Sequence, residues 1–449
     1  MGLRCGIMDR RQWLAASFGL LQAATATLFL RPAELWPALE GLPLFEGLTA
    51  LALLLASPTL VQHFSPAMLC LQPISLCALG MLPAVIISHV QHGYLSGAWE
   101  SAQAMAKPLL FYGLVITTVN TPSRLRAFLL NVAVCTSTMV TLCLLDYYHV
   151  VELEFLEHLH DVDGEDDEGL PLLVYRLRGT GIFHDPNDLA MVITAGGVLA
   201  WTFLQDCQLG LWRWGWLLPL IVEATALLET KSRGGLLAAC LAGLMLACFR
   251  YGMKLAVPLA VVSVLTLPVV AGRAARISLS SGSTGHERIE MWREGYDALK
   301  SLDLLFGVGH NMFADFAGLV AHNSFVHCYV ELGIVGGSIF FGAWYFAAVQ
   351  LWRLGRLRPP VWHAGLQQLR PTIAALLTGW CGSMLSLSRA YVVPTWLVLG
   401  TAVAYLNLCW IHTPAVRPLC VWEPHHLWKW GGASFATFVG FYIITRIAA

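Results

Sequence analysis

The segment FVHCYVELGIVGGSIFFGAWYFAAVQLW, residues 325–352, decides the fold class of this chain. A helix needs about 17–25 apolar residues to cross a bilayer, and this run exceeds that length. Similar apolar runs flank it at 13–30, 42–60, 67–90, 104–120, 127–148, 187–204, 211–228, 234–250, 254–272, 371–387, 391–411 and 431–447. The sequence therefore predicts an all-α fold, a polytopic bundle of 12 or 13 transmembrane helices, with the run near Lys107 and the last run the weakest.

Composition supports a membrane protein. Hydrophobic residues make up 57% and charged residues 12% of the 449 residues, with a mean hydropathy of +0.64. A soluble chain carries about 25% charged residues. The net charge of −1 gives no electrostatic footprint for nucleic acid, so no nucleic-acid partner is expected.

The chain is expected to form one integral membrane domain over residues 1–449, without a soluble domain or an obvious internal repeat. The first run follows Arg4, Arg10 and Arg11 and could pass for a signal peptide, but its length and the many spans after it favour an uncleaved signal anchor. Most of the 12 cysteines lie inside apolar runs, and the two longest polar loops contain none. This pattern argues against a disulfide framework and a cysteine metal site.

Lysine and arginine residues in the short loops predict that the N-terminus is cytoplasmic. Two long loops then lie outside: an acidic one at 149–186 and one at 273–325 that holds an amphipathic helix. Three basic clusters are found outside, against the rule: Arg176 and Arg178; Lys231 and Arg233; and Arg273, Arg276, Arg288 and Arg293. Positive charge kept there against the insertion bias indicates a binding function.

Polar residues open three of the predicted helices on that outer side. Asp185 can cap a helix that begins at Pro186, and Ser232 can cap the next inward-running helix. His322-Asn323-Ser324 opens a third. A helix N-terminus beside an arginine binds anions, and phosphate in particular. Three such ends on one face indicate a diphosphate.

Each feature has a simpler alternative. A capped helix start is usually structural, Arg233 could be a snorkelling interfacial residue, and a lone histidine such as His322 is more often buried and satisfied. Arg288 lies in a helix whose apolar residues recur at helical spacing (Ile289, Trp292, Tyr296 and Leu299), so this helix could rest on the membrane surface. Capped helix starts, arginines and a histidine that occur together on one side favour a functional site more strongly than any one of these features alone.

Two other patterns favour structural interpretations. The acidic run Glu152–Glu168 predicts a solvated, flexible loop rather than a metal site. A seam of small residues, Gly235, Ala239, Gly243 and Ala247, predicts helix packing. The HExxH, GxSxG and Walker motifs are missing from the sequence, which weakens interpretations as a metalloprotease, serine hydrolase or ATPase.

Taken together, the motifs between about 176 and 340 resemble the O-antigen ligase and O-antigen/exopolysaccharide polymerase superfamily of bacterial envelopes. His322 and Asn323 are followed at the family spacing by Gly333 and Gly336, and Ser232-Arg233-Gly234 opens a helix. The loop motif is matched by Arg288, Trp292, Gly307, Gly309 and Phe313, and the segment Arg178 to Asp185-Pro186-Asn187 also resembles one found in many members.

The resemblance implies a metal-independent glycosyltransferase of GT-C-like architecture, acting in lipopolysaccharide biosynthesis at the periplasmic face of the bacterial inner membrane. It would transfer a glycan from an undecaprenyl-diphosphate donor to an acceptor sugar, such as the lipid A–core, without a cofactor. Carried over by motif, Arg233 and Arg288 would bind the diphosphate, and His322 would activate the acceptor hydroxyl. Substrate-binding residues would be Arg178, Asn187, Asn323, Ser232 and Trp292. A second pair, His310-Asn311, lacks the glycine spacing and ranks below His322.

Ligase and polymerase share these motifs, so the choice between them stays open. The alternative from another class is a transporter or flippase that binds a lipid-linked glycan without reacting it. Transporters place charged groups near the membrane midplane, in broken helices of repeated halves. In this sequence the arginine, asparagine and histidine residues named above are all predicted at one face of the membrane, which favours an enzyme.

Overall fold

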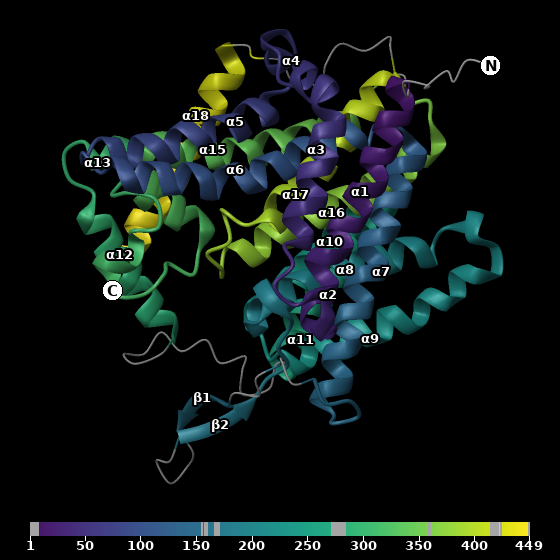
Figure 1. The fold of residues 1–449 in the computed structure, drawn as a ribbon. Helices are drawn as coiled ribbons and strands as arrows, with labels where there is room; N and C mark the ends of the chain where they lie inside the picture. Colours follow the sequence, from purple (N-terminus) through teal and green to yellow (C-terminus); the bar gives the residue numbers. More distant parts are fainter. Residues whose placement is uncertain are drawn as a thin grey trace.

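The computed structural model describes residues 9–153, 156, 160–165, 171–270, 284–357, 361–413, 422 and 424–447. Nearly all of them are helical (Figure 1). The α-helices are α1 Arg10–Leu30, α2 Pro32–Leu35, α3 Leu44–His63, α4 Pro66–Leu71, α5 Pro73–Val90, α6 Leu95–Thr118, α7 Pro122–Tyr147, α8 Pro186–Leu204, α9 Leu217–Glu229, α10 Arg233–Tyr251, α11 Met253–Val270, α12 Thr284–Ala298, α13 Asp303–Phe306, α14 Phe313–Ala317, α15 Ser324–Leu354, α16 Ala364–Met384, α17 Val393–Ile411 and α18 Pro424–Ile447. Short 3-10 helices occur at η1 Pro37–Leu39, η2 Gly181–Phe183 and η3 Cys207–Trp216. The predicted all-α bundle is confirmed.

A small hairpin departs from the prediction of a flexible acidic loop. Strands β1 His160–Glu165 and β2 Pro171–Tyr175 pair antiparallel, with His160 opposite Tyr175, and project from the bundle in Figure 1. The run Pro171–Tyr175 is rich in apolar and β-branched residues, which favour strands. Parts of both predicted loops, 154–155, 157–159, 166–170 and 271–283, lie outside the described residues, and these include Arg273 and Arg276.

Every apolar run predicted to span the membrane falls on a helix. By length and composition, the described part of the chain has nine helices that qualify as membrane spans. The other predicted runs fall on α6, α11, α16 and α18. A count of 12 or 13 spans therefore stays a prediction, while a multi-pass membrane protein is supported.

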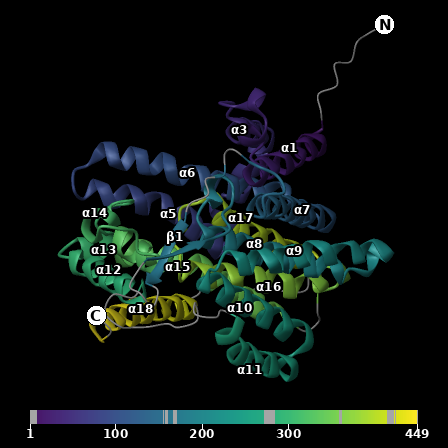
Figure 2. The same ribbon diagram turned by 90° about the horizontal axis from the view of Figure 1, so that it is seen from below.

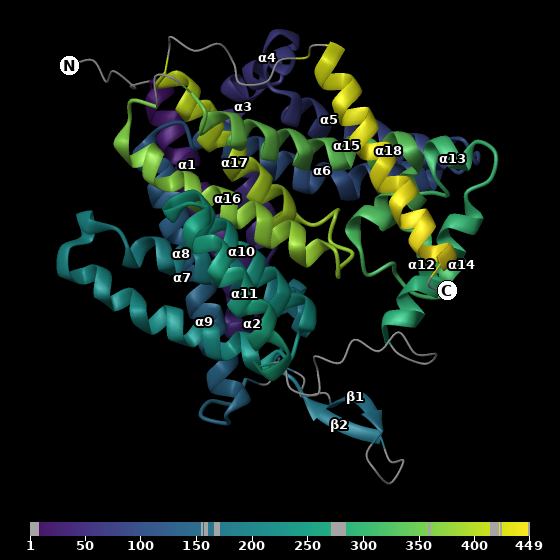
Figure 3. The same cartoon turned by 180° about the vertical axis from the view of Figure 1, so that it is seen from behind.

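The strongest helix packing joins segments far apart in sequence. In Figure 3 α10 and α16 lie side by side, and α5 packs between α6 and α15. Small residues allow the α10–α16 approach: Gly379 and Gly382 of α16 face Ala238 and Ala242 of α10. The predicted seam packs only in part: Gly235 lies against Ala190 of α8, whereas Ala239, Gly243 and Ala247 line a cavity.

Contacts between distant loops divide the molecule into two faces. On the face that we call the loop face, Lys231 Nζ donates to Tyr175 O at 2.8 Å. On the opposite face, Arg126 Nη2 pairs with Asp206 Oδ2 at 2.6 Å. The loop face is built from residues 91–94, 175–186, 229–233, 299–323 and 385–392, and the opposite face from 119–126, 204–208, 250–253 and 354–363. Of the described arginines singled out from the sequence, Arg176, Arg178 and Arg233 lie in these loop-face segments, and Arg288 lies on α12, which leads into the segment 299–323.

Cysteine chemistry agrees with the sequence for the residues described. The ten cysteines within the described ranges are all free thiols, and Cys77, Cys135, Cys143, Cys328 and Cys409 are buried. They behave as small apolar side chains in the helix packing.

Candidate active site

Three capped helix starts lie on the loop face, as the sequence predicts. Asp185 Oδ1 accepts the Asn187 N–H at 2.7 Å at the start of α8. Ser232 Oγ accepts the Gly235 N–H at 3.1 Å at the start of α10. Asn323 Oδ1 accepts the N–H groups of the first turn of α15 at 2.9 and 3.1 Å. The positive ends of three helix dipoles therefore point to the same side.

The starts of α8 and α10 are joined directly. Ser232 Oγ donates to Asn187 Oδ1 at 2.6 Å, and Arg176 Nη2 also approaches that oxygen at 3.4 Å. Arg176 Nε donates to Thr230 O at 2.9 Å, which ties the entrance of α8 to the end of α9. Asn187 and Ser232 thus meet, with their polar atoms bound to each other.

Arg176 contributes directly to this junction. Arg178 Nη1 lies 3.3 Å from His184 Nε2, within its own segment. The sequence singled out both arginines as a basic cluster but favoured Arg178, because it begins the Asp185-Pro186-Asn187 motif. Spacing alone could not show which guanidinium turns toward α10.

Arg288 projects from α12 into the same charged region. Burial lowers the pKa of its half-buried guanidinium, Asp185 raises it, and the positive charges of Arg176 and Arg233 lower it further. Three arginines from different segments therefore act on one another. Mutual repulsion of this kind is relieved by an anion between them.

The stripe of α12 packs inside the protein instead of resting on the membrane surface. Tyr296 contacts Phe438 of α18 at 5.3 Å between ring centroids, and Trp292 contacts Phe441 at 5.7 Å. Trp292 Nε1 donates to Ala321 O at 2.5 Å. Seen from the loop face in Figure 2, α12 lies beside α18 and α15. Trp292 therefore supports the backbone beside His322, rather than offering its N–H to a substrate.

His322 lies between this support and the cap of α15. Its φ of +48° is in the left-handed region, which is uncommon for residues other than glycine, although histidine adopts it more often than most. Burial lowers the pKa of His322 below its ordinary value of 6.5, and the charge of Arg288 lowers it further. The side chain is half-buried, so it is a neutral imidazole near pH 7 that solvent still reaches.

His310 has a different environment. Its ring is buried, its Nδ1 lies 3.0 Å from Ser101 Oγ, and its N–H donates to Ser88 Oγ at 3.1 Å. Tyr391 packs against the ring at 4.4 Å. These contacts hold His310 between α5, α6 and the loop before α17.

The glycines of the family motif have a structural role. Gly333 has φ +66° and breaks α15, so the carbonyl groups of Val330 and Glu331 lose their helical partners. Val308 N–H and Gly309 N–H donate to these two oxygens, each at 3.1 Å. The loop motif therefore docks on the break in α15 and fixes the segment that leads to His322.

The sequence did not single out Arg389, in the short loop between α16 and α17. Its Nε donates to Asp188 Oδ1 at 2.5 Å, and its Nη2 pairs with Asp188 Oδ2. Its charge also lowers the pKa of His322. An available signal was its position: it is another arginine that the predicted topology places outside, against the charge rule.

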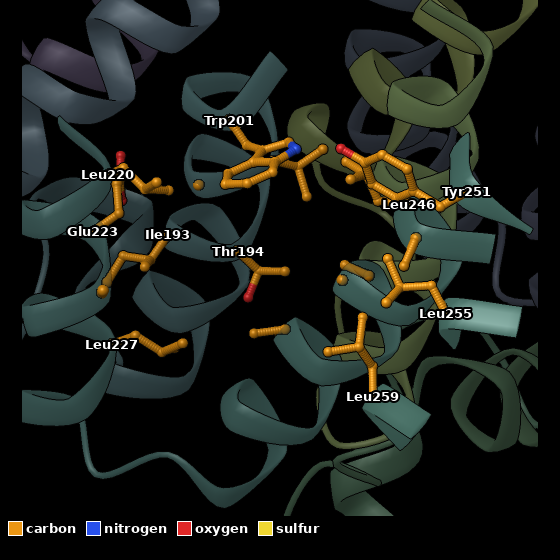
Figure 4. A pocket seen from close by; sticks show the side chains of 17 residues that line it. Ile193, Thr194, Trp201, Leu220, Glu223, Leu227, Leu246, Tyr251, Leu255 and Leu259 are labelled. Atoms are coloured by element: carbon orange, nitrogen blue, oxygen red, sulfur yellow. The ribbon is translucent and has the colours of Figure 1, made fainter. Parts of the chain in front are cut away.

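An apolar cavity of about 550 Å³ lies between α8, α9, α10 and α11 and extends to Tyr251, the last residue of α10 (Figure 4). Its lining comes from α8, α9, α10 and α11, and Figure 4 shows Trp201 and Tyr251 at one end and Leu227 and Leu259 at the other. The acid in its lining, Glu223, accepts a hydrogen bond from Ser137 Oγ of α7 at 3.2 Å. Ile193 follows Pro186 by about two helical turns, or about 10 Å along the axis.

Comparison with known proteins supports the family resemblance. Residues 218–341 match the family model described as O-antigen ligase. The match includes Ser232, Arg233, Arg288, Trp292 and His322, and it supports glycosyl transfer of the O-antigen ligase or polymerase type. No curated protein matches the chain.

Proposed function

We propose that this chain, which belongs by its central segment to the O-antigen ligase family, transfers a glycan from an undecaprenyl-diphosphate-linked donor to the lipid A–core. The whole chain would act as one integral membrane domain in the bacterial inner membrane, with the loop face in the periplasm. The observation that carries the proposal is that Arg288 interacts electrostatically with Arg176, with Arg233 and with His322, where α8, α10 and α15 begin.

The arginines suit the donor's diphosphate. Guanidinium groups bind phosphate oxygens in a bidentate manner and keep their charge at any physiological pH. As the sugar departs, negative charge grows on the diphosphate, and fixed positive groups in a partly dry site stabilise it. In this proposal, Arg233 and Arg288 supply the charge that a divalent metal supplies in many nucleotide-sugar enzymes.

His322 suits the acceptor. The acceptor oxygen attacks the anomeric carbon, the bond from that carbon to the diphosphate oxygen breaks, and the diphosphate leaves with the bonding electrons. His322 takes the proton of the attacking hydroxyl, for which it must be neutral. Its lowered pKa supports this role, because burial and Arg288 both disfavour the imidazolium.

The apolar cavity suits the isoprenoid chain of the donor. It begins about two helical turns inward from the start of α8 and is lined mostly by apolar side chains of α8 to α11. Gly243 leaves free space on the cavity side of α10, since an added Cβ atom there would meet no described atom within 4 Å.

We expect Gly243→Phe to fill the cavity and raise the donor KM several-fold, while Leu237→Phe, on the exposed side of α10, leaves the donor KM unchanged. With a donor of truncated chain the two variants should behave alike, and a persisting difference would contradict this assignment.

The central experiment gives purified protein a defined undecaprenyl-diphosphate glycan and a lipid A–core acceptor. Arg233→Ala should lower kcat/KM by about 10²-fold, the size seen on removal of one group that stabilises a developing charge. Arg250→Ala is the matched control, because Arg250 is an exposed arginine at the opposite end of the same helix. Equal activity of Arg233→Ala and Arg250→Ala would contradict the proposed site.

Transfer should also survive excess EDTA. A loss of transfer that Mg²⁺ restores would contradict the proposal that arginines replace a metal ion.

The acceptor distinguishes ligase from polymerase. A ligase links the glycan to the lipid A–core, whereas a polymerase extends a second lipid-linked repeat. Longer lipid-linked products with an unmodified lipid A–core would favour the polymerase alternative. Tight donor binding without any transfer would favour the transporter.

A further inference from the structure

We infer that the loop 385–392 between α16 and α17 aligns the proposed site, and that Arg389 is its positioning residue. This inference rests on the proposed function. The motifs recognised in the sequence do not include the loop, yet it contacts the starts of all three helices that form the site.

The contact with α15 is made by the backbone of the loop. Ser324 follows Asn323 and is fully buried. Its Oγ donates to Leu387 O at 2.6 Å and accepts the Arg389 N–H at 2.8 Å. The first residue of α15, two positions after His322, is therefore held by two hydrogen bonds to the loop.

The contact with α8 is made by the Arg389 side chain. Its guanidinium binds both carboxylate oxygens of Asp188, and Asp188 is only 1% exposed. A buried carboxylate left without its partner is strongly destabilising, so the pair fixes the distance between loop and helix. The neighbouring Asn187 binds Ser232, and this extends the connection to α10.

The contact with α10 explains a glycine of the Ser-Arg-Gly motif. A Cβ atom on Gly234 would lie 2.3 Å from Ser386 Oγ and 2.9 Å from Ser386 Cβ. Only glycine leaves room for the loop at this point. The position next to Arg233 must therefore be glycine, because Ser386 occupies the space that a side chain would need. The loop thus packs against all three helix starts.

The loop also places a positive charge near His322. The charged and titratable groups that act on His322 are Arg288 of α12, Asp185 before α8, Arg389 of the loop and His327 of α15. Arg389 and Arg288 both favour the neutral imidazole. Removing the charge of Arg389 should raise the pKa of His322, so more of the base is protonated as the pH falls.

The test measures transfer by Arg389→Gln, with Arg370→Gln as control. Arg370 is also a half-buried arginine, but it lies on α16 near the opposite face and binds Leu351 O. We expect Arg389→Gln to lower kcat by about 10²-fold, the effect of a small misplacement of reacting groups, with the donor KM little changed. Its acidic limb in the pH profile of kcat/KM should move to higher pH, and Arg389→Lys should recover part of the rate.

A second pair of variants tests the loop without removing a charge. Gly234→Ala should lower kcat through the clash with Ser386, and adding Ser386→Gly should restore it by making room. Wild-type protein that transfers no glycan would refute the proposed function itself. Active wild type with Arg389→Gln equal to Arg370→Gln, or with only the donor KM raised, would refute the positioning role.

Discussion

Arg288 and His322 show how neighbouring charges adjust single residues at the loop face. Arg288 is surrounded by Arg176 and Arg233, with Asp185 as the opposing charge. His322 is then influenced by Arg288 in turn, so its imidazole is neutral over a wider pH range than a solvent-exposed histidine. The same arginines that suit a diphosphate therefore also suit a general base beside it.

His322→Ala should lower kcat by about 10²–10⁴-fold, the usual contribution of a general base, with donor binding almost unchanged. In the wild type, kcat/KM should fall as the pH drops through the pKa of free-enzyme His322, with a midpoint below 6.5. His310→Gln serves as control, since the His310 ring contacts Ser101 and Tyr391 and its backbone N–H binds Ser88. It should keep its turnover, and a dead but folded His310→Gln would show that the wrong histidine was chosen.

At the scale of elements, the break in α15 joins two motifs that are separate in sequence. The loop at Gly307 to Gly309 binds the carbonyl groups freed at Gly333. A Cβ atom on Gly333 would lie 2.3 Å from the Leu305 carbonyl carbon, and one on Gly307 would lie 2.1 Å from Glu331 O. Both glycines are therefore required by close backbone approach. Trp292 of α12 separately supports the segment that carries His322 through its bond to Ala321 O.

Gly333→Ala should destabilise the protein. The combination of φ +66° and ψ −172° is essentially restricted to glycine and costs a residue with a side chain about 1–3 kcal/mol, and the backbone clash adds to that cost. Thermal unfolding in detergent measures the effect. Gly431→Ala is the control, because a Cβ atom there meets nothing described within 4 Å and its helix, α18, is regular. Equal melting temperatures for the two variants would contradict the docking of the loop on the break.

At the scale of the whole molecule, helices that alternate in direction bring distant loops to two faces. The loop face collects residues from the segment before α8 to the loop before α17, while Arg126, Asp206 and Arg250 belong to the opposite one. Figures 1 and 2 show the hairpin projecting on the side where α8 and α10 begin. A site assembled from three inward-running helices needs this arrangement.

The orientation of the two faces gives a direct prediction. A tag inserted after Gly164, in the hairpin segment, should be accessible from the periplasm, and one after Leu357 should be accessible from the cytoplasm. The reason is the excess of arginine in the loop around Leu357, since positive residues stay on the cytoplasmic side. Labelling of intact cells and of opened cells distinguishes the two sides. Both tags on one side, or the reverse assignment, would overturn the periplasmic site.

The sequence alone determined the class of the protein and much of the site. Long apolar runs have few ways to satisfy their backbone in a bilayer, so each was predictably a helix. The caps at Asp185, Ser232 and Asn323 were equally predictable, because a cap is a local interaction between residues two or three apart. The O-antigen ligase resemblance followed from motifs of the same local kind, and the family model confirmed it.

Only the tertiary structure decided which distant residues meet. In the structure, Arg176 approaches Asn187 and the apolar stripe of α12 packs against α18. Arg389 binds Asp188, which is far away in the sequence. The register of the small-residue seam was likewise decided by the partner helix, since Ala238 and Gly243 lie on different sides of α10. Periodicity and spacing describe one segment at a time, whereas side-chain direction and helix packing depend on the other helices. That is why the helix starts were visible in the sequence, and the loop that aligns them was not.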